Sequence, residues 1–195
     1  MGKAEGKKEV SGSNSLKVAV KTPAAPPLAS RGFYQVEEDA LYVPIYPGGK
    51  FFSFLDSPQV TLDVDPKGRL LFVQILVARH SWQVRPDISP PVDPPGADVR
   101  FLDFRDKIPD ARVETSPNHS LAHVIFGELH ANRSYRVADN LIVDLTADNT
   151  LAAIWVTAIE DDRAARAMAK WRKEIRETYD KQGPDSHLTR IEIDR

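Results

Sequence analysis

The chain has 195 residues, of which 42% are hydrophobic and 28% charged, a balance that argues against wholesale disorder and against a fibrous or membrane protein. The formal net charge of -2 gives no general electrostatic reason to bind nucleic acid. Cysteine is absent, which excludes disulfides and thiolate chemistry. Apolar runs fall far short of the roughly 18 to 20 residues that span a bilayer, so we expect a cytoplasmic protein without a membrane partner.

Residues 1–31 form a basic N-terminal arm rich in Gly, Ser, Lys, Ala and Pro. Residues 1–22 hold five Lys against two Glu, so any contact with nucleic acid should be weak and come from this arm. The composition buries too little apolar surface to order by itself, which predicts disorder. The alternative is docking, because Leu16, Val18 and Val20 alternate like an edge strand that could add to this protein or to a partner.

A first β unit is predicted over residues 32–83. Apolar and β-branched residues gather in two pairs of strands, each pair joined by a turn: residues 33–36 with 40–45, and residues 60–64 with 69–77. In the second turn, Pro66 presets φ and Gly68 supplies the positive φ that closes a type I turn with a bulge.

A proline-rich stretch at residues 84–98 separates this unit from a second one at residues 99–160. Dense proline stiffens the backbone, which predicts a connector or, alternatively, a polyproline ligand for an aromatic groove. Beyond it the β pattern returns at residues 99–104, 111–114, 121–126, 140–145 and 151–159. Sliding the sequence by 81 positions aligns the two units without a gap and matches Asp63 to Asp144. We therefore predict a tandem pseudo-repeat.

The C-terminal part changes to a helical period. One face of a predicted amphipathic helix over residues 161–182 carries Ala164, Met168, Trp171, Ile175 and Tyr179. Asp161 and Asp162 suit its N-terminus, and the Gly and Pro at 183–184 suit its end. Residues 183–195 should form an extended tail, in which Ile191 and Ile193 alternate like a short strand.

The second unit resembles the small DUF2283 domain. The similarity lies in residues 121–127, in the run Val137-Ala138-Asp139-Asn140-Leu141-Ile142-Val143-Asp144, and in residues 151–159. The first unit resembles the family more weakly, through residues 39–43 and 61–70. The resemblance implies a small β fold with no established activity. Some members look like partners of toxin-like proteins, which would imply an antitoxin-like role.

Catalytic and metal-binding patterns are not evident. On one strand His119 and His123 would lie about 13 Å apart, too far to share a zinc ion. Asp63 and Asp144 each sit among apolar residues, and strand alternation places each on the face opposite those neighbours. An acid–base pair formed by the two aspartates in a cleft between the units is the catalytic alternative.

The sequence as a whole predicts a mainly β (α+β) protein with two hairpin units in tandem, one C-terminal helix and a disordered arm. We expect a non-catalytic protein-binding or assembly module, as a subunit of a larger complex or a homo-oligomer, without cofactor or metal. The alternatives are a small-molecule binder or hydrolase with a site between the units, and an antitoxin-like partner. The residues predicted to contact a partner are Leu16, Val18, Val20, Trp171, Ile191 and Ile193.

Overall fold

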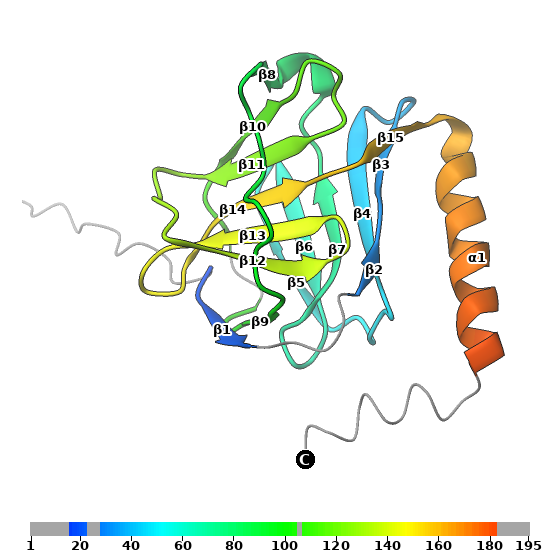
Figure 1. Cartoon of the computed structure of the whole chain (residues 1–195), viewed down its shortest axis with the longest axis horizontal. Helices are drawn as coiled ribbons and strands as arrows, with labels where there is room; N and C mark the ends of the chain where they lie inside the picture. The colour runs from blue at the N-terminus through cyan, green and yellow to red at the C-terminus, as the bar shows by residue number, and fades with distance from the viewer. Residues whose placement is uncertain (1–15, 23–27, 105–106, 183–195) are drawn as a thin grey trace, which may run out of the picture.

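The computed structural model describes residues 16–22, 28–104 and 107–182, which form a sandwich of two β-sheets with an α-helix beside it (Figure 1). The predicted mainly β fold is confirmed. Both sheets contribute to one hydrophobic core, whose fully buried side chains include Leu41, Leu62, Ile75, Phe126, Leu145 and Ile154.

The strands of the first sheet follow the order β15-β3-β4-β7-β6-β5, and β2 pairs with β4. They are β2 (Ala29–Ser30), β3 (Gly32–Gln35), β4 (Ala40–Tyr46), β5 (Ser53–Asp56), β6 (Val60–Val64), β7 (Leu70–Ile75) and β15 (Ile159–Asp162). The second sheet has the order β12-β13-β14-β11-β10-β8. Its strands are β8 (Gln83–Val84), β10 (Ala111–Thr115), β11 (Ala122–Phe126), β12 (Arg133–Ala138), β13 (Leu141–Leu145) and β14 (Leu151–Val156).

The two halves repeat the same strand pairing at the predicted offset of 81 residues. Strand β6 pairs with β7 as β13 pairs with β14, with equivalent partners, and the register slips just after Asp63 and just after Asp144. The turns match as well, because Gly68 (φ 77°) and Asn149 (φ 60°) both adopt the left-handed conformation. The predicted role of Gly68 is confirmed, since its N–H donates to the Asp65 carbonyl at 2.9 Å and closes the turn.

Each half also contributes a strand to the sheet of the other half. Strand β8 follows β7 in the chain but lies parallel to β10 in the second sheet, and β15 follows β14 but lies parallel to β3 in the first. The leading strands β1 (Val18–Lys21) and β9 (Asp98–Phe101) pair with one another. Next to β1, Lys17 bridges to Thr150 of the second half, while Arg100 of β9 bridges to Arg69 of the first. Neither half therefore completes its own sheet.

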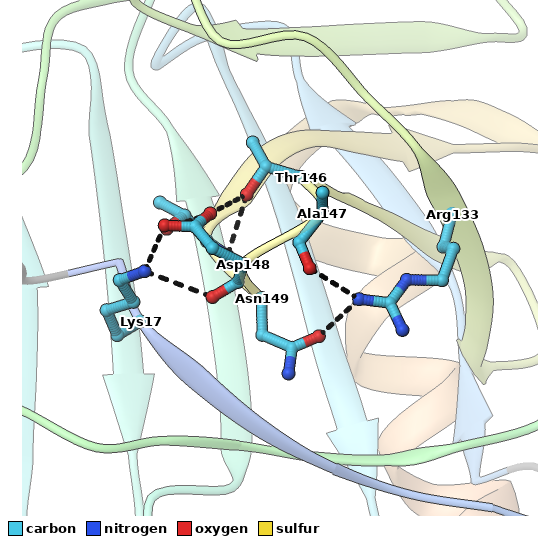
Figure 2. Close-up of polar contacts among 7 residues, drawn as sticks. Lys17, Arg133, Thr146, Ala147, Asp148 and Asn149 are labelled. Atoms are coloured by element: carbon cyan, nitrogen blue, oxygen red, sulfur yellow. Dashed lines mark hydrogen bonds and ion pairs between the residues drawn. The ribbon is translucent and has the colours of Figure 1, made fainter.

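The described part of the arm is docked, which is the alternative that the sequence left open. Leu16 and Val18 are each only 2% exposed and belong to the shared core. Figure 2 shows how the arm is held: the Lys17 ammonium contacts the Asp148 carboxylate and donates to the Asp148 carbonyl at 3.0 Å. Hydrogen bonds from Lys17 and Thr146 lower the pKa of Asp148. Residues 1–15 lie outside the described residues.

Two predicted boundaries were wrong. Residues 99–104 do not join the second sheet, since β9 ends at Phe101 and pairs with β1. The helix α1 (Arg166–Gln182) begins later than predicted, because Asp161 and Asp162 extend β15 along β3. Between β15 and α1 lies a 3-10 turn (Arg163–Ala165) with positive φ at Ala164 and Ala165. Asp162 still caps α1, because its carboxylate accepts the Ala167 and Met168 N–H groups at 2.7 and 3.1 Å.

Candidate functional site

Each sheet turns one face to the shared core and the other outward, and a further segment of the chain packs on each outer face. The proline-rich residues 85–97 run across the six-stranded sheet from β8 toward β9 (Figure 1). Ile88 of this segment packs on Leu121, Ile142 and Trp155. The predicted connector therefore has a structural task besides linking the units. Helix α1 packs on the outer face of the seven-stranded sheet, over β3 and β4.

The outer face of the six-stranded sheet holds a buried polar cluster around Asp144. The Asp144 carboxylate, 5% exposed, accepts hydrogen bonds from the Trp155 indole N–H at 2.7 Å and the Ser134 hydroxyl at 2.6 Å. The His123 ring stacks on Trp155 with 3.6 Å between ring centroids. Its Nδ1 lies 3.8 Å from Glu114 Oε2. Burial lowers the pKa of His123, and the carboxylates of Asp144 and Glu114 oppose that shift, so the ring is neutral at pH 7.

An open pocket of about 270 Å³ lies between this cluster and the connector. It is lined by Arg85, Asp87, Ile88, Ser89, Glu114, His123 and Trp155. Arg85 Nη1 lies 3.7 Å from Glu114 Oε1, which ties the connector to the sheet. Within the described part of the chain, no group of three His, Asp or Glu side chains is arranged to hold a metal ion. The contacts around the pocket fasten the connector to the sheet.

Helix α1 covers only one side of the seven-stranded sheet. Met168 and Trp171 are buried against Phe33, and the Trp171 ring lies 5.7 Å from that of Phe33 and 5.1 Å from that of Tyr46. Of the predicted apolar face, Met168, Trp171 and Ile175 thus pack within the chain. Ala164 does not, because it lies exposed in the 3-10 turn before α1. Strands β7, β6 and β5 follow β4 in the sheet order and form the half of the sheet farther from β3 and β15.

An aromatic surface, formed by Tyr42, Phe54, Phe72 and Asp63, lies on the outer face of this sheet. Strand pairing sets Phe54 on β5 and Phe72 on β7 directly beside Asp63 on β6. Phe72 stacks on Tyr42 with 5.8 Å between centroids and an interplanar angle of 7°. Phe54 is 44% exposed. The Tyr42 hydroxyl donates to Glu38 at 2.6 Å, and burial together with Glu38 raises the pKa of Tyr42 to about 12.

Asp63 and Asp144 are equivalent in the fold but differ in their surroundings. Asp144 is bonded by two donors, whereas no donor among the described residues contacts the Asp63 carboxylate. Burial beside the aromatic rings raises the pKa of Asp63, because loss of water disfavours the charged form. The two aspartates lie on the outer faces of opposite sheets with the core between them, so the acid–base pair envisaged between the units does not form.

The residues predicted to bind a partner fall in different places. Leu16 and Val18 are core residues, and Val20 packs against the core. Trp171 belongs to α1 and is buried between the helix and the sheet. Ile191 and Ile193 lie outside the described residues. The sequence analysis missed Phe54, whose alternation with buried Ser53 and Leu55 was the signal for β5.

Comparison with known proteins adds no function. No family model matches the chain, and no curated protein matches it. The similarity to DUF2283 therefore stays a prediction. No helix within residues 16–22, 28–104 and 107–182 is long and apolar enough to cross a membrane.

Proposed function

We propose that this protein is a non-catalytic protein-binding module and that the aromatic surface is its binding site. The observation that carries the proposal is the contrast between the two equivalent aspartates. Asp144 is a satisfied structural residue, while Asp63 holds a carboxylate among aromatic rings without a hydrogen-bond donor in the described chain. The Asp63 side chain is only half-buried, so its carboxylate stays accessible at the surface, where a hydrogen-bond donor from a partner can reach it.

The chemistry of the surface supports the same conclusion. Phe and Tyr are enriched at the centres of protein interfaces, where they bury large areas at little entropic cost. Phe51 and Phe52, which immediately precede β5, are also exposed, at 55% and 44%. Because β5 is the last strand of its sheet, a partner can approach the surface from the β5 edge, whereas Tyr42 at the other end packs against the cluster under α1.

The experiment compares two single variants of the full chain as bait in a lysate of its source cells. Phe54→Ser removes an exposed ring from the aromatic surface. Val92→Ser removes an apolar side chain that is 96% exposed on the connector, and serves as the matched control. We expect a partner that the wild type and Val92→Ser retain and that Phe54→Ser loses by at least tenfold, the usual effect of truncating a central aromatic residue.

Binding is then measured with the purified partner, and circular dichroism checks that both variants keep the wild-type fold. Capture that is equal for the two variants contradicts the proposed site. Sedimentation of the wild type and of Phe54→Ser tests whether the partner is a second copy of the chain, because self-association through this surface would disappear in the variant.

A further inference from the structure

The partner chemistry can be stated more closely, on the basis of the proposed function, from the row of side chains that crosses β5, β6 and β7. In this row Asp63 lies between Phe54 and Phe72, with Pro44 of β4 beyond Phe72. Side chains directly opposite on neighbouring strands have Cβ atoms about 4.5–5.5 Å apart. A group placed over the Asp63 carboxylate is therefore also in reach of both rings.

A cation satisfies this combination better than a neutral donor. The negative faces of aromatic rings attract an ammonium or guanidinium group, and the carboxylate supplies a full counter-charge. A guanidinium is planar and weakly hydrated, so it can stack on a ring while it donates to a carboxylate. A neutral donor would gain only the hydrogen bond.

We infer that the aromatic surface binds an arginine side chain presented by an apolar segment of a partner protein, with Asp63 as the counter-ion and Phe54 and Phe72 as its walls. The argument is charge complementarity: within the described residues, this carboxylate has no cationic partner of its own. The equivalent site in the other half cannot do the same, since Ser134 and Trp155 already occupy the Asp144 oxygens.

The test uses the full chain and a blocked tripeptide, acetyl-Val-Arg-Val-amide, followed by NMR of ¹³C-labelled Phe rings. The same peptide with citrulline in place of arginine keeps the shape and loses the charge. We expect the arginine peptide to shift the Phe54 and Phe72 signals and the citrulline peptide to bind at least tenfold more weakly. Added salt should weaken binding of the arginine peptide and leave binding of the citrulline peptide unchanged.

Two matched variants test whether the Asp63 carboxylate is the charge that binds the arginine side chain. Asp63→Asn should lower the affinity for the arginine peptide at least tenfold. Asp110→Asn removes the same charge from an exposed position before β10 and should leave affinity unchanged. Equal binding by the two variants, or no shift of the Phe54 and Phe72 signals, overturns the inference. A gain in peptide affinity on deleting residues 1–15 would also overturn it, because the occupant would then be the chain's own Lys-rich segment.

The inference and the proposed function fail separately. If partner capture is lost with Phe54→Ser but unchanged with Asp63→Asn, the surface binds a protein without using its carboxylate, and only the arginine inference falls. If capture is unchanged with Phe54→Ser, the proposed function falls, whatever the tripeptide does.

Discussion

Replacing Asp63 and Asp144 by asparagine, one at a time, should affect the stability of the free protein very differently. At Asp144 the new side chain keeps an acceptor for the Trp155 indole and presents its amide to the Ser134 hydroxyl, so both bonds survive without charge. Hydrogen bonds to charged groups contribute about 1 kcal/mol more than neutral ones. For the two bonds together, Asp144→Asn should lower the free energy of unfolding by about 2 kcal/mol.

At Asp63 no hydrogen bond with the described residues is lost, and the desolvated charge is removed. We expect the free energy of unfolding to stay within about 0.5 kcal/mol of the wild type, with any change toward greater stability. The sign follows from the pKa. Because the folded-state pKa of Asp63 is raised above 3.8, the ionised form destabilises the fold at neutral pH, and this effect disappears as pH falls below the unfolded value.

Urea unfolding at pH 7 and at pH 3.5 measures both effects, and thermal unfolding gives a second readout. For a chain of this size, about 2 kcal/mol corresponds to a Tm lower by about 4–8 °C. A loss at Asp63→Asn as large as that at Asp144→Asn would refute the reasoning. It would mean that Asp63 has a structural partner within the protein, and this result would contradict the proposed binding role.

Three further predictions concern the β6–β7 turn, the polar cluster around Asp144 and the docked N-terminal arm. Gly68→Ala should lower stability by about 2 kcal/mol or more, since a Cβ there would lie 2.2 Å from the Phe101 carbonyl at a φ of 77°; urea unfolding measures this. His123→Gln should remove part of the stability loss between pH 7 and pH 5, because the unfolded chain protonates below about 6.5 more readily than the buried ring; an unchanged pH profile would contradict it. Asp148→Asn should speed amide exchange at Val18 at low salt, and the effect should shrink in 1 M NaCl.

The strands and turns of the sandwich were predictable because their signals are local. Period-two alternation marks β6, a short and nearly continuous apolar run marks β13, and the Pro and Gly of the β6–β7 turn fix its shape. The duplication was predictable for the same reason, since two copies of one local pattern recur at a constant offset.

The exchange of strands between the halves was not predictable from local pattern. Strand β8 has two residues, Gln83 and Val84, too few to show a period. The start of α1 was missed because pairing of β15 with β3 overrides the helical preference of Asp161 and Asp162. A hydrogen bond of 2.5 Å from Gln35 to Asp162 helps to hold that pairing.

At the candidate site the equivalence of the two aspartates was predictable but the difference between them was not. A constant offset would place Tyr135 in the position of Phe54. Strand β12 is shifted by one residue relative to β5, so Ser134 lies opposite Asp144 while Phe54 lies opposite Asp63. This single step in register decides which carboxylate gains a hydroxyl donor and which gains a ring, and register between strands is a property of the assembled sheet.

The reciprocal exchange of β8 and β15 has a consequence for symmetry. A single unit of this kind would have to fold as a swapped homodimer, and its twofold axis would give both outer faces the same residues. Joining two units in one chain keeps the intertwined core and holds the halves at a high effective concentration. It also releases the faces from identity. One face is covered by the proline-rich residues 85–97, over the hydrogen-bonded Asp144, and the other leaves the Asp63 side chain half-exposed.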